Sequence, residues 1–184
     1  MRVVAGLAGG RQLRAPAGRQ LRPTSERVRE ALFNALGSLD AVDGATVVDL
    51  FAGTGALGIE ALSRGAASAT FVDADLHAVR AIEDNLGATG LGDRATVVHA
   101  DVFRFLEGAP PTPYDIAFAD PPYAFTDWPR LLGLLPARLA ALEARTHVEL
   151  GPGWHPLRSK RYGDTVVTLA RRAAGAPAGH EEEG

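Results

Sequence analysis

The residues best suited to chemistry form the tetrad Asp120-Pro121-Pro122-Tyr123, which follows an apolar run at residues 115–119. Its two prolines remove two backbone N–H donors and stiffen the loop, so carbonyl oxygens stay free to accept hydrogen bonds. This suits an exocyclic amino group of a nucleic-acid base, which can donate to the Asp120 carboxylate and the Pro121 carbonyl. These bonds would favour a pyramidal nitrogen facing a methyl donor, while Tyr123 stacks on the extruded base. The tetrad therefore predicts methyl transfer to a base amino group; the alternative is a proline-rich turn capped by aspartate.

A second candidate site follows the first apolar run of the central region. Gly53, Gly55 and Gly58 fit the pattern G-x-G-x-x-G at a strand–helix junction, and Asp73 stands twenty residues after Gly53. Glycines let a ligand approach the backbone closely, and a carboxylate can hold ribose hydroxyls. Taken alone, this pattern fits NAD as well as S-adenosylmethionine.

Two further carboxylates, with the tetrad, favour S-adenosylmethionine. Asp49 lies inside the first strand, where a dinucleotide-binding fold would place an apolar residue. A buried carboxylate needs a positive partner, and the cofactor's ammonium group is a suitable one. Asp101 follows the third strand, where it can accept a hydrogen bond from an adenine amino group or cap the next helix. The residues expected to bind the cofactor are Asp49, Phe51, Ala52, Gly53, Thr54, Gly55, Asp73, Asp101 and Val102.

The surrounding elements must bring these residues together. Apolar, β-branched runs occur at residues 46–51, 69–72, 95–99, 115–119 and 146–150. Helical patterns lie between them at residues 56–64, 75–86, 102–107 and 128–142. This alternation predicts an α/β fold with a parallel sheet, whose ligands bind beyond the carboxyl ends of the strands. Residues 156–162 and 164–170 flank Gly163-Asp164 and predict a closing antiparallel hairpin.

The two ends of the chain differ from the centre. Residues 2–5 and 11–15 predict a β-hairpin, and Thr24 or Ser25 is expected to cap a helix that ends at Gly37. The expected apolar face of that helix is Val28, Ala31, Leu32, Ala35 and Leu36, with Arg27 and Arg29 pointing off it. We expect a basic N-terminal segment at residues 1–38, a cofactor-binding domain at 39–172 and a disordered acidic tail at 173–184.

The net charge of −3 conceals an uneven distribution. Residues 1–30 hold seven arginines and two acidic residues, and residues 154–172 hold five basic residues and one acidic residue. The intervening residues 31–153 hold seven basic and sixteen acidic residues. Basic flanks around an acidic centre suit a polyanion outside and a cationic ligand inside, although solvated faces would give the same count.

The composition also narrows the class of protein. The chain has no cysteine, which rules out disulfides and thiolate metal sites, and no histidine–carboxylate spacing suggests a metal. It shows neither a secretory signal nor an apolar run long enough to span a membrane. We therefore expect a soluble cytoplasmic protein, which we take to be a monomer.

Three further stretches carry a resemblance to a known family. They are Gly10-Arg11, Arg22-Pro23-Thr24 running into residues 27–34, and Tyr162-Gly163-Asp164-Thr165. Together with the tetrad and residues 49–61, they make the chain similar to the RsmD family of bacterial 16S rRNA guanine-N2 methyltransferases over residues 1 to about 172.

The resemblance implies a class I methyltransferase: a Rossmann-like, seven-stranded sheet, mostly parallel with an antiparallel last strand, behind an N-terminal β-hairpin and helix. It implies S-adenosylmethionine as cofactor and 16S rRNA, in the small ribosomal subunit or its assembly intermediate, as partner. The methyl group would go to N2 of a guanine held by Asp120 to Tyr123. Two departures are Asp73, where the family often has glutamate, and a compact stretch between Glu149 and Arg158.

A basic ledge beside the pocket is expected to position the RNA backbone. The residues expected to bind RNA are Arg11, Arg14, Arg22, Thr24, Arg27, Arg29, Arg158, Lys160 and Arg161. Three alternatives remain: a DNA adenine-N6 or cytosine-N4 methyltransferase, a non-catalytic rRNA-binding assembly factor, and a nicotinamide oxidoreductase. The first shares the tetrad chemistry, but so short a chain leaves no room for a separate target-recognition domain.

Overall fold

Strand β1 (Thr46–Leu50) lies at the centre of the fold because all its residues except Thr46 are buried. The computed structural model describes residues 1–15, 26–108 and 113–174. Strand β1 pairs in parallel with β2 (Ser68–Asp73) on one side and with β4 (Tyr114–Ala119) on the other. Because the chain moves outward through β2 and then returns to the other side of β1, a crevice is expected beyond the carboxyl ends of β1 and β4.

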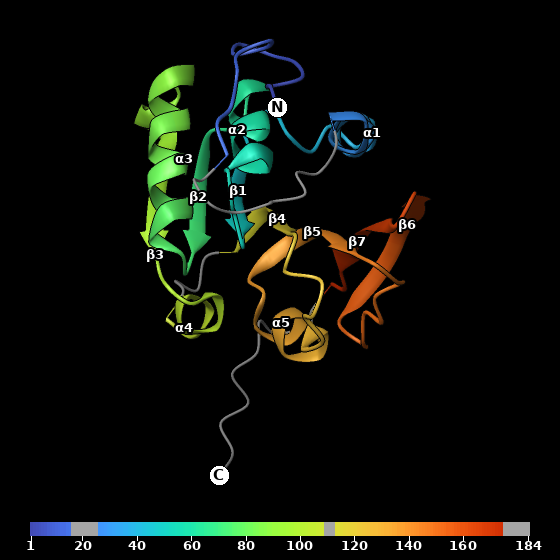
Figure 1. Cartoon of the computed structure of the whole chain (residues 1–184). Helices are drawn as coiled ribbons and strands as arrows, with labels where there is room; N and C mark the ends of the chain where they lie inside the picture. The colour runs from blue at the N-terminus through green and yellow to red at the C-terminus, as the bar shows by residue number, and fades with distance from the viewer. Residues whose placement is uncertain (16–25, 109–112, 175–184) are drawn as a thin grey trace.

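The described strands form one seven-stranded sheet in the order β3-β2-β1-β4-β5-β7-β6 (Figure 1). The remaining strands are β3 (Ala95–His99), β5 (Ala137–Ala144), β6 (Trp154–Tyr162) and β7 (Thr165–Arg172). Strands β1 to β5 pair in parallel, whereas β7 runs antiparallel to both β5 and β6. The predicted fold class and the hairpin around Gly163-Asp164 are therefore confirmed.

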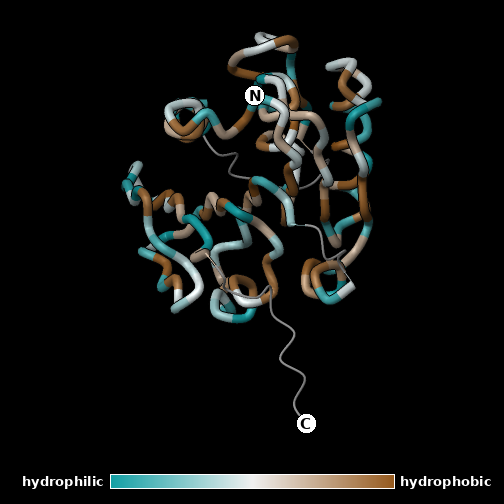
Figure 2. Tube along the Cα trace, turned by 180° about the vertical axis from the view of Figure 1, so that it is seen from behind, coloured by the Kyte–Doolittle hydropathy of each residue, from teal (hydrophilic) through white to brown (hydrophobic). Residues whose placement is uncertain are grey.

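Helices cover both faces of this sheet (Figure 1). Helices α1 (Glu26–Gly37), α2 (Ala56–Ser63) and α3 (Leu76–Thr89) pack on one face. Helices α4 (Val102–Glu107) and α5 (Trp128–Leu134) pack on the other, and a short 3-10 helix, Gly92–Arg94, precedes β3. Strand β4 shows the alternation, because Ile116 and Phe118 contact the first layer while Ala117 and Ala119 contact the second. Colouring by hydropathy shows that apolar residues recur along the sheet and the helices packed on it (Figure 2).

The stretch from residue 128 to residue 150 corrects the sequence prediction. The expected helix over 128–142 ends at Leu134, and the fifth strand is Ala137–Ala144 rather than residues 146–150. Alanine and leucine are strong helix formers, so this Ala- and Leu-rich stretch looks helical in isolation. Pro136 cannot continue a helix, and a place between β4 and β7 requires extended backbone with small side chains. Tertiary packing thus overrides local preference here.

The predicted N-terminal hairpin is present only as a short antiparallel pairing, in which Val3 N donates to the Arg11 carbonyl at 2.9 Å and Leu13 N to the Met1 carbonyl at 2.8 Å. Arg2 and Gln12 make one isolated antiparallel bridge in place of two strands. The backbone N–H groups of Val4 and Ala5 bond to helix α2 instead: they donate to the Glu60 carboxylate at 2.7 and 3.1 Å. The described N-terminal residues have no core of their own, because their buried side chains join the core cluster of the sheet. None of the helices in the described ranges is long and apolar enough to cross a bilayer.

Candidate active site

A cavity of about 1260 Å³ lies beyond the carboxyl ends of β1, β2, β4 and β5. It brings together most of the residues singled out in the sequence, although they come from four separate segments. The predicted residues that line it are Asp49, Phe51, Ala52, Gly53, Thr54, Asp73, Asp101, Val102, Asp120, Pro121, Pro122 and Tyr123. The predicted cofactor residue Gly55 is not among the lining residues; it has a φ of 74°, and a Cβ there would meet Ile82 and Phe71 at 3.3 Å.

Asp49 is the most buried carboxylate of the cavity wall. Its side chain is 2% exposed and accepts a hydrogen bond from Gly58 N at 2.8 Å. Burial raises the pKa of Asp49 to about 8, and the nearby charges of Asp120 and Asp73 act in the same direction. The Gly58 hydrogen bond only partly opposes this effect. The site therefore holds a carboxyl group that ionises readily only when a positive charge arrives.

The turn after β1 is held in an unusual backbone conformation. Phe51 has a φ of 57°, which is rare for a residue other than glycine, and Gly53 has the same φ. Gly58 has a different role, because a Cβ there would lie 2.3 Å from the Phe71 ring. The glycines of this loop thus shape the turn and allow α2 to pack closely on β2.

Two further carboxylates organise the loops around the cavity. Asp73 accepts from Gly53 N and from Asp75 N, each at 2.9 Å, which ties the end of β2 to the turn after β1. Asp101 accepts from Phe103 N at 2.9 Å and from Arg104 N at 3.1 Å. Asp101 therefore caps α4, the alternative that the sequence left open, and it also lines the cavity.

The tetrad leaves β4 and runs along the cavity edge. Asp120 is half-buried, whereas Tyr123 is 47% exposed. The Pro122 carbonyl accepts a hydrogen bond from Phe125 N at 2.8 Å, which closes the turn. The Arg145 guanidinium lies 4.2 Å from the centre of the Tyr123 ring. The tyrosine thus has a cation on one face at the cavity mouth, an arrangement that fixes its ring.

The structure adds an aromatic wall in which only Phe51 was predicted to be a site residue. Phe125 contacts Phe51 at 5.4 Å, Phe103 at 6.2 Å and Trp128 at 5.0 Å between ring centres. All four rings line the cavity, and they suit a flat heterocycle. The density of aromatic residues just after the tetrad was the available signal.

Two charged lining residues, Glu143 and Arg145, were also missed. They occupy the last part of β5 and the residue after it, in a stretch that the sequence assigned to a helix or a loop. Among the described residues that line the cavity, Arg145 is the single arginine or lysine, against six carboxylates. The interior is thus strongly acidic.

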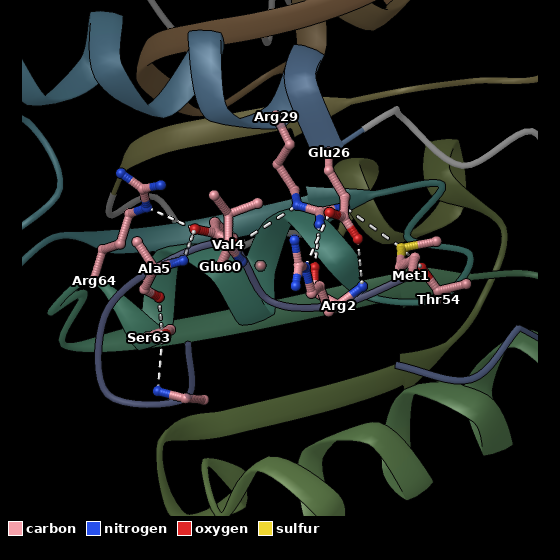
Figure 3. Close-up of polar contacts among 12 residues, drawn as sticks. Met1, Arg2, Val4, Ala5, Glu26, Arg29, Thr54, Glu60, Ser63 and Arg64 are labelled. Atoms are coloured by element: carbon pink, nitrogen blue, oxygen red, sulfur yellow. Dashed lines mark hydrogen bonds and ion pairs between the residues drawn. The ribbon is translucent and has the colours of Figure 1, made fainter. Parts of the chain in front are cut away.

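A buried ion-pair cluster joins the N-terminal residues, α1 and α2 (Figure 3). Arg29 is fully buried and lies 3.5 Å from the Glu60 carboxylate, while Arg64 pairs with the same carboxylate at 2.7 Å. Arg29 also donates to the Arg2 carbonyl. Burial lowers the pKa of Arg29, and Glu60 opposes that effect. The expectations that Arg29 points off the apolar face of its helix and binds RNA are therefore wrong, because its guanidinium is the counter-charge of Glu60.

The other predicted RNA-binding residues fall in different places. Arg11 donates to the Ala88 carbonyl at 2.8 Å, near the C-terminal end of the 14-residue helix α3. Asn85, three residues before Ala88 in α3, donates to the carbonyl of Thr54, which lines the cavity, so Arg11 lies on the α3 side of the site and its contact with RNA stays a prediction. Arg14, near the same end of α3, and Arg27 are exposed, whereas Arg22 and Thr24 lie outside the described residues.

The predicted RNA-binding residues of β6 lie at the edge of the sheet next to residues that line the cavity. Arg158, Lys160 and Arg161 are all exposed. Arg161 donates to the carbonyl of Arg145 at 3.2 Å, and the Lys160 ammonium lies 5.3 Å from the ring centre of Tyr162, which lines the cavity. These contacts join the β6 edge to the cavity mouth.

Comparisons with known proteins agree with this geometry. The family model described as Conserved hypothetical protein 95 matches residues 1–171. The ribosomal RNA small subunit methyltransferase D of Escherichia coli K12 is 36% identical, over 95% of this chain and 91% of that protein. The solved structure of yhhF from Escherichia coli matches with a TM-score of 0.82 and 35% identity, covering 95% of this chain and 98% of the other. SMU.776, solved in complex with SAH, shares the fold at a TM-score of 0.67 and 18% identity, covering 82% of this chain and 50% of its own.

Proposed function

The chain belongs to the Conserved hypothetical protein 95 family, the RsmD family that its motifs predict, and we propose that it methylates N2 of a guanine in 16S rRNA with S-adenosylmethionine as methyl donor. The Escherichia coli relative named as ribosomal RNA small subunit methyltransferase D is matched over nearly its whole length. The observation that carries the proposal is the placement of the tetrad and Asp49 in one acidic cavity.

The residues of the cavity fit S-adenosylmethionine better than a nicotinamide cofactor. A cationic ligand would pair its ammonium group with Asp49, and its ribose hydroxyls would bond to Asp73. The aromatic wall around Phe125 would hold its adenine. NAD would instead bring two phosphates into a wall with six carboxylates and one arginine among the described residues. The sulfonium of bound S-adenosylmethionine would supply the methyl group.

The tetrad would prepare the guanine amine for transfer. The two N2 hydrogens would bond to the Asp120 carboxylate and the Pro121 carbonyl, and Tyr123 would stack on the base, opposite Arg145. The cofactor would supply the methyl group, and Asp120 would accept the proton that N2 releases as it is methylated. The exposed arginines and lysine of β6 would hold RNA phosphates outside the cavity.

The test is methyl transfer to under-modified small subunits with tritiated S-adenosylmethionine. We expect label in one guanine, and no label in subunits or free 16S rRNA would refute the proposal. Label in duplex DNA would favour a DNA methyltransferase, and failure to bind S-adenosylmethionine would favour a non-catalytic assembly factor.

Asp120→Ala should retain cofactor binding by calorimetry and lose methyl transfer by at least about a hundredfold. Asp93→Ala removes an exposed carboxylate outside the cavity and should leave both unchanged. An active Asp120→Ala enzyme would contradict the role given to the tetrad. The monomeric state and the cytoplasmic location stay predictions.

A further inference from the structure

Glu143 is a buried carboxylate that the reaction above does not use. Its residue is 4% exposed, lies in strand β5 and lines the cavity. Sequence reasoning gave it no role, because its stretch was predicted to follow a helix. A glutamate so far from water is costly unless its charge and oxygens are satisfied. Its position in the active-site wall therefore needs a reason.

The strand register places Glu143 beside Asp120. Ala119, the last residue of β4, is aligned with Leu142 of β5, and the residues that follow are Asp120, just beyond the end of β4, and Glu143 within β5. Neighbouring strands lie about 4.8 Å apart, and aligned residues of parallel strands point to the same side. Both residues line the same cavity. One planar base can therefore reach both carboxylates along a single edge.

A buried guanidinium lies near Glu143 and provides a counter-charge. Arg29 is the nearby cation, since Glu143 is among the carboxylates that stabilise the charge of Arg29. Arg29 also forms an ion pair with Glu60 at 3.5 Å and donates a hydrogen bond to the Arg2 carbonyl. A counter-charge role alone would not require Glu143 to form part of the cavity wall. Arg29 thus accounts for the charge of Glu143, and the cavity accounts for its location.

Guanine offers the complementary chemistry. Its N1–H lies next to the N2 amine, so a base whose N2 bonds to Asp120 presents N1–H to the adjacent strand. Adenine N1 and cytosine N3 carry a lone pair at the equivalent place, next to their own amines, and would face a carboxylate without a proton between them. Such an unmatched buried pair is strongly disfavoured.

We propose that Glu143 selects guanine by accepting a hydrogen bond from its N1–H while Asp120 holds the N2 amine. The inference rests on the proposed function, because it concerns the substrate of that same site. It makes Glu143 a specificity-determining residue, distinct from the catalytic tetrad. It also gives a reason why two carboxylates stand at the ends of neighbouring strands.

The test replaces the target guanine with 2-aminopurine, which keeps the N2 amine but has an unprotonated N1. After the labelled guanine is mapped, 16S rRNA with either base is assembled by ligation of a synthetic segment and reconstituted into small subunits. The wild-type chain should prefer guanine by at least about tenfold in kcat/KM, because 2-aminopurine cannot donate to Glu143. Equal rates on the two substrates would overturn the inference without any variant.

Glu143→Gln then separates recognition from folding. Its amide can donate to N1 of 2-aminopurine, so the preference for guanine should fall at least about tenfold relative to wild type, with cofactor affinity retained. The change in the ratio is diagnostic, since a structural defect would lower both rates together. Glu149→Gln changes an exposed glutamate that does not line the cavity and should keep the wild-type ratio.

The outcomes distinguish the two proposals. If wild type labels guanine and the ratio of folded Glu143→Gln equals that of wild type, the role of Glu143 is wrong and the proposed function stands. If wild type labels no guanine, the proposed function fails and the inference fails with it. If Glu143→Gln does not fold, the inference is judged from the wild-type ratio of kcat/KM on guanine and 2-aminopurine substrates alone.

Discussion

Replacing Asp49 by asparagine should change how stability depends on pH. The carboxyl of Asp49 is buried, and its pKa is raised to about 8, from about 3.9 for an unperturbed aspartate. Asparagine has the same shape and can still accept the hydrogen bond from Gly58 N, but it does not ionise. The variant therefore removes one titration and little else.

The size of the effect follows from the two pKa values. Stability contributed by a group with a raised pKa is fully present below pH 3.9 and is lost as the pH rises through about 8. Between pH 6 and 8 the folded carboxyl is mostly protonated and the unfolded one is ionised, so each pH unit lowers the free energy of unfolding by up to about 1.4 kcal/mol. Allowing for partial ionisation near pH 8, wild type should lose roughly 2 kcal/mol relative to Asp49→Asn over this window.

The assay is urea unfolding of both proteins without cofactor at pH 6, 7 and 8. The other ionisable groups are common to both proteins and cancel in the difference. Asp101→Asn serves as control, because it removes the charge of an exposed aspartate but keeps an oxygen that can cap α4, so its difference from wild type should be the same at each pH. A constant difference between wild type and Asp49→Asn would refute the reasoning, since it would mean that folded Asp49 is ionised throughout.

Three further predictions concern the cofactor, the glycine loop and the buried ion pair. S-adenosylmethionine binding should release up to one proton between pH 6 and 7, because the ammonium group would ionise Asp49. For the same reason, the affinity for S-adenosylmethionine should rise up to about tenfold over this pH range. Calorimetry in buffers of different ionisation enthalpy measures the proton release, and Asp49→Asn should abolish it. Gly58→Ala should lower the free energy of unfolding by about 1–3 kcal/mol, because its Cβ would lie 2.3 Å from the Phe71 ring. Gly87→Ala, with open space at its Cβ in α3, should be neutral or stabilising in the same urea series, and equal losses at both glycines would contradict the packing role. Arg29→Met should cost about 1–3 kcal/mol, because the buried Glu60 loses one of its two arginine partners but keeps Arg64 and two backbone donors. Exposed Arg27→Met should cost less than about 0.5 kcal/mol, and similar losses for the two arginines would be inconsistent with a buried ion pair.

The sequence predicted the fold where local pattern and tertiary context agree. Strands β1 to β4 are apolar and rich in β-branched or aromatic residues, so their periodicity identifies them directly. Strand β5 is Ala- and Leu-rich, and its extended form comes from the two strands that flank it. That information is not local, and only Pro136 marked the break.

The same distinction separates the predicted from the unpredicted parts of the site. Asp49, Asp73 and Asp120 were found because each carboxylate ends or interrupts an apolar strand, an unusual place for a charge. Glu143 was not identified as a site residue, because the sequence did not predict its strand. Arg29 was predicted to point away from the core, because helical periodicity cannot reveal a charged partner on another element. Glu60, the buried ion-pair partner of Arg29, lies on α2, 31 positions further along the chain.

The distribution of charge explains how a chain of net charge −3 can act on RNA. Carboxylates concentrated in the cavity would attract a cationic cofactor but repel phosphates, so only an extruded base can enter while the RNA backbone stays outside. The exposed cations of β6 stand where that backbone would lie, and Arg161 reaches the carbonyl of Arg145 at the cavity mouth. Arg145 in turn lies over Tyr123, the residue proposed to stack on the base. The boundary between the acidic interior and the basic edge therefore lies at Arg145 and Tyr123. This division, rather than the total charge, would allow a cationic cofactor and RNA to bind side by side.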